Sequence, residues 1–206
     1  FFIKNLWESE EGKNIGLNYF KERGYSEDTI QKFELGYSPK QKDIFTQEAS
    51  KKLFSQEYVI KSGLALDIDN KGLIDRFRER VMFPIHSFSG RILGFGGRAL
   101  NPNAKAKYQN SPESLIYNKS KILYGIYFAK NEISKKDNCF IVEGYTDVIS
   151  LHQKGIENVV SASGTSLTID QIKLINRFTK NITILFDGDA AGIKASFRSV
   201  DLILKE

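Results

Sequence analysis

The 206-residue sequence is 41% hydrophobic and 27% charged, which is typical of a globular protein with one large domain or two small ones. It has no apolar run near the ~20 residues of a membrane span, and its one cysteine, Cys139, excludes an internal disulfide or a multi-cysteine zinc site. We expect a cytoplasmic protein with a buried, unreactive thiol, and a piece of a longer chain because the first residue is Phe1. The formal net charge of +5 mildly indicates a polyanionic partner.

The amino-terminal part of the sequence has helical periodicity. The stretch "GLNYFKERGY" predicts a helix that ends at Gly24, and "SEDTIQKFELGY" predicts a second helix that begins at the N-cap Ser26 and stops at Gly36. Residues 43–63 form a further helical stretch. We interpret residues 1–35 as a packing module.

Two strands joined at Ser89-Gly90 are predicted in "VMFPIHSFSGRILGFGGRAL", with Pro84 at a sheet edge or a bulge. The segment "GFGGRA" formally fits a dinucleotide-binding fingerprint, but the residues after it, "LNPNAKAKYQNSP", cannot open the helix that such a site needs. We therefore reject that site and expect a glycine-rich strand that something approaches closely.

Basic residues gather in the middle of the chain. If "DRFRERV" leads directly into the next strand, Arg76, Arg78 and Arg80 share one face. Either a bound polyanion or a solvated basic edge would explain such a face. The basic and aromatic residues that follow are Arg98, Lys105, Lys107, Tyr108, Lys119 and Lys121. A tyrosine among lysines is typical of surfaces that bind single-stranded nucleic acid.

Strand and helix patterns alternate three times after Cys139. The strands are "CFIVE", "NVVSA" and "NITILFD", and each is followed by a helical segment, the second of which has Thr168 as its predicted N-cap. This alternation predicts a parallel, wound α/β sheet. The fold class is therefore α/β, with an α+β amino-terminal part before the parallel sheet.

Three carboxylates lie where the strands of this sheet end. Glu143 ends the first strand, and Asp187 and Asp189 end the third. Asp187 with Gly188 would also suit a turn, and Asp189 would suit a helix N-cap. Carboxylates that converge from separate strands favour a divalent cation, and ligands that are all oxygen suit Mg²⁺ or Mn²⁺.

Six motifs together resemble the RNA polymerase core of bacterial DnaG-type DNA primases. They are "DRFRERVMFPI", "GRILGFGGRAL", "KYQNSPES" with "YNKSKILYG", "VEGYTDV", "SASGTS" and "FDGDAAG", in the order of that family and over nearly the whole chain. The resemblance implies an amino-terminal catalytic subdomain over residues 1–136 and a Toprim domain over residues 137–206, truncated at its carboxyl end. It implies that the catalytic metal ligands are Glu143, Asp187 and Asp189. The DNA- and nucleotide-binding residues that it implies are Arg76, Arg78, Arg98, Lys107, Tyr108, Asn110 and Lys119.

The function implied by the resemblance is the synthesis of short RNA primers on single-stranded DNA by metal-dependent nucleotidyl transfer. The implied partners are the template, ribonucleoside triphosphates, the RNA product and the replicative helicase of a bacterial replisome, and a monomer is expected. Zinc is expected only in an amino-terminal module outside this chain, and the helicase contact is expected in a separate domain. The family has a further acidic pair on the strand after the last helix, so the metal site is expected to be incomplete in a chain that stops at Glu206.

Two alternatives remain open. One is a non-catalytic Toprim-type scaffold that binds single-stranded DNA, and the other is a different Toprim enzyme, a nuclease or a topoisomerase. A type IA topoisomerase needs a catalytic tyrosine in a separate domain, and a Toprim nuclease would lack the "RFRERVMFP…GFGGR" subdomain. The three retained acids argue against a scaffold.

Overall fold

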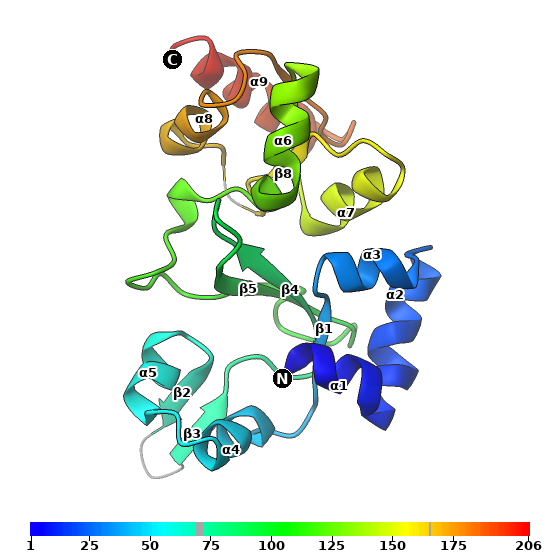
Figure 1. Cartoon of the computed structure of the whole chain (residues 1–206), viewed down its shortest axis with the longest axis vertical. Coiled ribbons are helices and arrows are strands. Elements are labelled where there is room, and N and C mark those ends of the chain that lie inside the picture. The colour runs from blue at the N-terminus through cyan, green and yellow to red at the C-terminus, as the bar shows by residue number, and fades with distance from the viewer. Residues whose placement is uncertain (69–71, 165) are drawn as a thin grey trace. The chain divides into compact units, whose positions relative to one another are not determined.

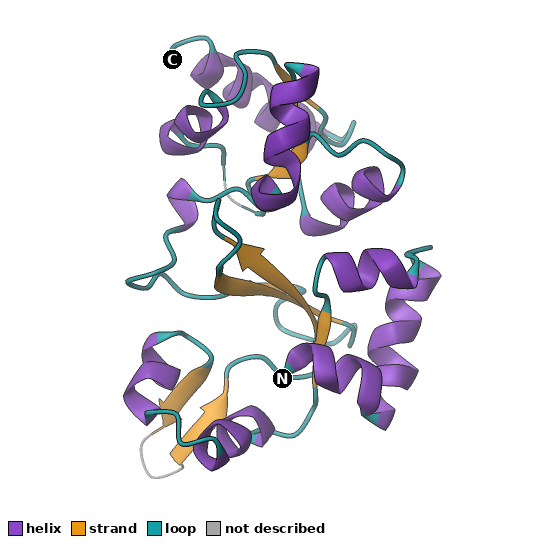
Figure 2. Ribbon diagram, in the orientation of Figure 1, coloured by secondary structure: helices purple, strands orange, loops and turns teal. Residues whose placement is uncertain are grey.

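The computed structural model describes residues 1–68, 72–164 and 166–206. The chain divides into two compact units: unit 1 comprises residues 1–85 and 93–117, and unit 2 comprises residues 86–92 and 118–206. Both units combine helices with strands, as the predicted α/β class requires (Figure 2). No helix in the described part of the chain is long and apolar enough to cross a membrane.

Unit 1 begins with helices and continues mainly with strands (Figure 1). Its elements, two of which extend into the 86–92 turn, are α1 (Phe2–Glu8), the π-helical η1 (Gly12–Leu17), α2 (Asn18–Glu22), α3 (Glu27–Lys32), β1 (Gly36–Ser38), α4 (Ile44–Lys51), α5 (Gln56–Lys61), β2 (Ala65–Ile68), β3 (Gly72–Asp75), β4 (Arg80–His86), β5 (Ile92–Ala99) and β6 (Tyr108–Asn110). The predicted helical stretch over residues 43–63 is confirmed as the two helices α4 and α5.

The predicted helix start at Ser26 is confirmed, because its Oγ accepts a hydrogen bond from the Thr29 N–H at 3.1 Å. The helix ends earlier than predicted, at Lys32. Glu34 has a φ of 52°, a left-handed conformation that no helix continues through, and Gly36 begins strand β1 instead of stopping a helix.

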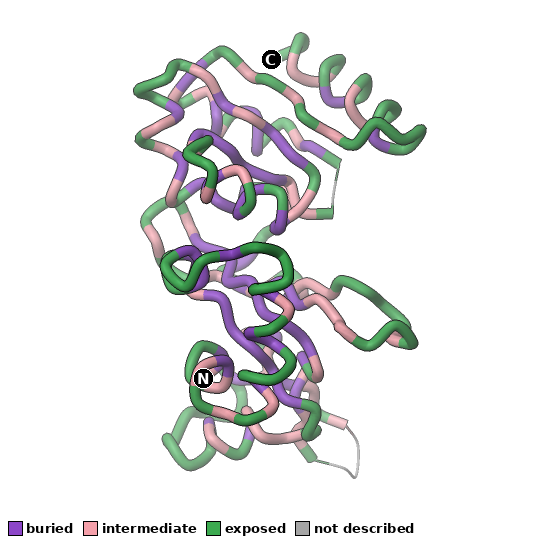
Figure 3. Tube along the Cα trace, turned by 90° about the vertical axis from the view of Figure 1, so that its right-hand side faces the viewer, coloured by how far each residue is buried: buried purple, intermediate pink, exposed green. Residues whose placement is uncertain are grey.

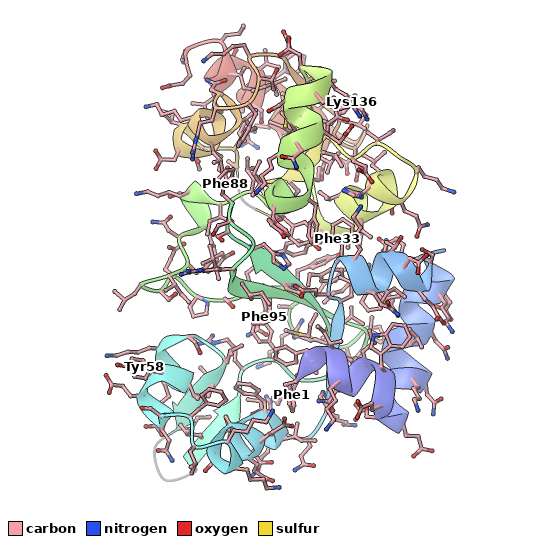
Figure 4. All side chains as sticks on the ribbon, viewed as in Figure 1. Phe1, Phe33, Tyr58, Phe88, Phe95 and Lys136 are labelled. Atoms are coloured by element: carbon pink, nitrogen blue, oxygen red, sulfur yellow. The ribbon has the colours of Figure 1, made fainter. Side chains whose placement is uncertain are left out.

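A four-stranded sheet with the order β1-β4-β5-β6 forms the centre of unit 1. The two strands predicted around Ser89-Gly90 are β4 and β5, and β4 is buried along its whole length, as the purple segments of Figure 3 illustrate. Strand β1 pairs only with residues 80–82 of β4, so the missing N–H of Pro84 lies beyond the last β1 pair. Figure 4 labels Phe1 and Phe95, which pack against the buried core residues Phe2, Phe77 and Met82.

A buried carboxylate starts helix α4. Asp75, at the end of β3, is 2% exposed, and its oxygens accept from the Phe45 N–H at 2.7 Å and the Thr46 N–H at 2.9 Å. Burial raises the pKa of this carboxyl, and the two backbone hydrogen bonds oppose that rise. Asp75 therefore supplies, from a distant strand, the cap that α4 lacks locally.

Replacing Asp75 by Ala is expected to lower the free energy of unfolding by about 2–4 kcal/mol, because one buried and one partly buried N–H group lose their acceptor. Urea unfolding monitored by circular dichroism measures this loss. Asp67→Ala is the matched control, because Asp67 is exposed on the neighbouring strand β2. Equal stability of the two variants would contradict the capping role of Asp75.

Unit 2 holds a three-stranded sheet with the order β8-β7-β9, and both strand pairs are parallel. Its other elements, in chain order with these strands, are η2 (Lys119–Lys121), α6 (Ile126–Lys136), β7 (Cys139–Val142), α7 (Tyr145–Gln153), β8 (Val159–Ser161), α8 (Ile169–Ile175), β9 (Ile182–Ile184) and α9 (Ala190–Ile203). The predicted alternation of strands and helices is confirmed. So is the N-cap at Thr168, whose side chain accepts from the Gln171 N–H.

The core of unit 2 includes Cys139, which is completely buried, and burial raises the pKa of its thiol to about 12. Helix α6 contributes Ile126 and Ile133 to the same core. By packing, α6 thus belongs with the parallel sheet that follows it. The resemblance to the primase family implies a boundary after residue 136, between the amino-terminal subdomain and the Toprim domain, and this boundary stays a prediction.

Candidate active site and nucleic-acid interface

The central strand β7 and its parallel neighbour β9 end at the same edge of the sheet, with Ile141 paired to Ile184. Glu143 follows β7 and Asp187 follows β9, and both are exposed. The backbone N–H of Asp187 donates to Glu143 Oε1 at 2.9 Å. The fold therefore brings the Glu143 carboxylate to the segment that carries Asp187, as the strand pattern predicts.

Asp189 has a structural role as well. It is the N-cap of α9, and its Oδ1 accepts from the Gly192 N–H at 2.7 Å. The capping interpretation left open by the sequence is thus confirmed for this residue. A capping carboxylate still has a second oxygen, so the cap and a cation ligand are compatible.

The candidate ligands at this edge of the sheet are all carboxylate oxygens, which are the ligand type that a hard divalent cation prefers. The hydrogen bonds of Glu143 and Asp189 each use one oxygen of the carboxylate, and the other oxygen can bind a cation. Within the described ranges, no three His, Cys, Asp or Glu side chains form a group that could hold a metal ion as they stand. The metal ligation by Glu143, Asp187 and Asp189 therefore stays a prediction.

Gly192 belongs to this site, although it was not among the predicted site residues. A Cβ at this position would lie 2.2 Å from the Asp187 carbonyl oxygen and 2.9 Å from Glu143 Oε1. Only glycine allows the first turn of α9 to approach both segments. The sequence contained one signal for this residue, a glycine in the first turn of a predicted helix. Glycine lowers helix stability relative to alanine, so its presence there indicates a close contact that a larger side chain would prevent.

The two roles of Asp189 can be separated by substitution. Asp189→Asn keeps a side-chain oxygen for the Gly192 N–H but removes the charge, so we expect normal stability and a loss of nucleotide incorporation. Asp189→Ala removes both, and we expect an additional loss of about 1 kcal/mol in the free energy of unfolding. Thermal unfolding and nucleotide incorporation, measured on both variants, check this. Full activity of Asp189→Asn would show that Asp189 is only a cap.

The arginines of "DRFRERV" line one cavity of about 310 Å³ in unit 1, together with Lys40, Glu79 and Gln109. The three arginines share one side of the unit as predicted, but they do not lie on an extended period-two strand, because β4 begins only at Arg80 and Glu79 has a φ of 52°. Arg78 is exposed, whereas Arg76 is partly buried and burial lowers its pKa.

Arg80 has a structural role in this cavity wall. It is 9% exposed, and its guanidinium donates to the carbonyl oxygens of Gly97, Ala106 and Lys107 at 3.0–3.3 Å. It thus fixes the segment between β5 and β6. Gly97 is required beside it, because a Cβ there would lie 2.8 Å from the Phe77 ring and 3.0 Å from Arg80 Cδ. The glycine-rich strand with a close approach is therefore confirmed.

The pairing of β5 with β6 places Arg98 and Gln109 on opposite faces of the sheet. Arg98 lies opposite Tyr108, and Gly97 lies opposite Gln109. Because neighbouring residues of a strand point to opposite faces, Arg98, Tyr108 and Asn110 lie on one face, which we name the tyrosine face. Gln109 lies on the other face, with the arginine cavity.

On the tyrosine face, the Arg98 guanidinium carbon lies 5.6 Å from the centre of the Tyr108 ring. Tyr108 is 42% exposed, so part of its surface remains accessible to a base. Lys107, immediately before β6, is exposed. Lys119 lies in η2 of unit 2. The structure thus brings Arg76 together with Arg78, and Arg98 together with Tyr108, as two separate groups.

Comparison with known proteins agrees with this architecture. Residues 1–130 match the model of the DNA primase catalytic core, N-terminal domain, and residues 140–206 match a Toprim-like family. A DNA primase of Halalkalibacterium halodurans is 42% identical over all of this chain, and one of Clostridium acetobutylicum is 43% identical over 98% of it. These alignments cover 34% and 33% of the relatives, so the chain spans about a third of their length.

Solved structures show the same fold. The RNA polymerase domain of the Mycobacterium tuberculosis primase DnaG has a TM-score of 0.90 at 32% identity, covering 97% of this chain and 67% of that one. The E. coli primase catalytic core has a TM-score of 0.89 at 37% identity, covering 98% and 64%. A DnaG primase catalytic domain bound to single-stranded DNA has a TM-score of 0.87 at 36% identity, covering 98% and 62%. With a family match over residues 1–130 and a Toprim-like match after it, the chain belongs to the family of bacterial DnaG-type DNA primase catalytic cores.

Proposed function

We propose that the protein carrying this chain is a primase, which synthesises short RNA primers on a single-stranded DNA template by metal-dependent nucleotidyl transfer. The observation that carries the proposal is the meeting of Glu143 with the Asp187 segment at the ends of two adjacent parallel strands, in a chain of the primase family. Family membership makes a divalent metal the expected cofactor, and Mg²⁺ or Mn²⁺ fits the oxygen donors.

In this reaction the 3′-hydroxyl of one ribonucleotide attacks the α-phosphate of the next, and pyrophosphate leaves. Glu143, Asp187 and Asp189 would hold the cation, which when bound supplies charge neutralisation at the triphosphate and the nucleophile. The chain's own contribution is positioning, as in other phosphoryl transfers. Arg76 and Arg78 would hold phosphates in the arginine cavity.

Template binding is assigned to the remaining predicted residues, which are Arg98, Lys107, Tyr108, Asn110 and Lys119. Their contacts to phosphates would be independent of sequence and sensitive to salt, and Tyr108 would stack on a base. A relative solved with single-stranded DNA supports this partner. Ribonucleoside triphosphates, the replicative helicase, a monomeric state and a place in the bacterial replisome are further parts of the proposal.

The amino-terminal family match disfavours the alternative Toprim enzymes, because it covers the subdomain that a nuclease or topoisomerase would not need. The test is incorporation of labelled ribonucleotides on single-stranded DNA with Mg²⁺ or Mn²⁺, by this chain and by the complete protein that carries it. Template-dependent RNA from the complete protein is the expected result. Salt-sensitive DNA binding without RNA would favour the scaffold, and cleavage of the labelled DNA would favour a nuclease.

A further inference from the structure

We infer that Tyr19, in helix α2, positions the Arg98 guanidinium for a phosphate of single-stranded nucleic acid. The inference rests on the proposed function, because Arg98 is one of the residues assigned to template binding. Its new element is the role of an amino-terminal helix in that binding. A tyrosine far from the basic stretch in sequence would act through the arginine that it holds.

The first observation is that the Arg98 guanidinium contacts two tyrosine rings. Its guanidinium carbon is 4.9 Å from the centre of the Tyr19 ring and 5.6 Å from that of Tyr108. Arg98 Nη1 also donates to the Tyr19 hydroxyl. Stacking and a hydrogen bond together restrict a side chain that would otherwise lose much conformational entropy when it binds a ligand.

The second observation is that this arrangement leaves the arginine's charge and some of its donors available. Burial raises the pKa of the Tyr19 phenol, so the phenol stays neutral near pH 7 and does not compensate the guanidinium. The hydrogen bond from Nη1 to Tyr19 uses one of the five guanidinium N–H donors, and Arg98 is partly exposed although its Nε is buried. Arg98 and Tyr19 also line a cavity of about 410 Å³, whose other polar lining residues are Asn14, Asn18 and the acidic Glu22.

A held guanidinium with unused N–H donors is a recognition element for an anion, because its planar fork matches a phosphate or carboxylate. Tyr108, partly exposed on the same face, offers a stacking surface next to that anion site. A phosphate followed by a base is the repeating unit of a single strand, so one nucleotide would use both residues. Tyr19 in turn contacts Arg23, the C-cap residue of α2, whose guanidinium carbon lies 5.2 Å from the centre of the Tyr19 ring.

The experiment measures binding of a fluorescently labelled oligothymidylate to the 206-residue chain by anisotropy, over a series of salt concentrations. Arg98→Gln is expected to weaken binding about tenfold and to reduce the slope of log affinity against log salt by about 0.7. Tyr19→Leu is expected to weaken binding severalfold. Tyr19→Phe, which keeps the ring and loses only the hydroxyl, is expected to have a smaller effect of about threefold.

The decisive variant is the double substitution of Tyr19→Leu with Arg98→Gln. If Tyr19 acts only through Arg98, adding Tyr19→Leu to Arg98→Gln causes no further loss. Tyr58→Leu is the matched control: Tyr58 is 70% exposed in the same unit and outside both basic groups, so normal binding is expected. Thermal unfolding of each variant identifies any loss caused by misfolding, and Tyr19→Phe keeps the test valid if Tyr19→Leu unfolds.

Additive losses in the double variant would overturn the inference, as would normal binding by both Tyr19 variants beside weakened binding by Arg98→Gln. Normal binding by Arg98→Gln would instead overturn the assignment of Arg98 to template binding, on which the inference rests. The two failures are therefore distinguishable.

Discussion

Glu143→Gln and Asp187→Asn are each expected to lower RNA primer synthesis by more than about a hundredfold while leaving the fold intact. Glu143→Gln keeps an oxygen that can accept from the Asp187 N–H, so the link between the two strand ends survives. Asp187 contributes its backbone to that link, which Asn preserves. Both substitutions remove a negative charge that the proposed cation needs, so the loss falls on catalysis and not on stability.

Incorporation of labelled ribonucleotides by the complete protein, with thermal unfolding beside it, measures the two effects separately. Binding of single-stranded DNA by these variants is an internal control, because the template-binding residues are unchanged and binding should persist. Normal primer yield from either variant would rule out the metal assignment. Loss of both folding and activity would show that the carboxylates are needed for the structure of the sheet edge.

Gly192→Ala is expected to damage both stability and synthesis. The new methyl carbon would lie 2.2 Å from the Asp187 carbonyl oxygen, closer than any van der Waals contact allows. The opposing atom is backbone, so α9 or the Asp187 segment has to move. We expect a loss of about 1–3 kcal/mol in the free energy of unfolding. Synthesis should fall about a hundredfold, because a shift near 1 Å misplaces the carboxylates.

Gly188→Ala is the matched control, because a Cβ at Gly188 would meet no atom of the described residues within 4 Å apart from its chain neighbours. The two substitutions add the same group to the same "FDGDAAG" segment, so their difference isolates the steric contact. Chemical denaturation and primer synthesis should separate them clearly. If Gly192→Ala behaved as Gly188→Ala, the close approach described for α9 would be wrong.

The parallel sheet could be predicted from the sequence because its signals are local. Strand and helix patterns alternate with short connections after Cys139, and this order fixes which strand ends meet. The order of the strands alone was therefore enough to place Glu143 and Asp187 at one edge of the sheet. The sequence also offered Asp189 as a helix N-cap, which is confirmed. The close approach at Gly192 could not be predicted, because it depends on where α9 begins relative to β9.

The basic residues show where local reasoning fails. Period-two alternation assumes an extended backbone, and the left-handed Glu79 interrupts it between Arg78 and Arg80. Nothing in the spacing of "DRFRERV" indicates that the last arginine turns inward to three carbonyl oxygens. The contact between Tyr19 and Arg98 joins residues 79 positions apart, so no periodicity could have revealed it.

Because Cys139 is buried, chemical modification of its thiol can measure how often the sheet of unit 2 opens. It is the only cysteine in the sequence, it lies in β7 at the centre of the parallel sheet, and its thiol is completely buried. A maleimide or disulfide reagent meets this sulfur only when the sheet separates, and the raised pKa keeps the thiolate scarce until then. The rate of modification therefore follows the population of opened molecules, and it can rank substitutions at the sheet edge without any engineered label.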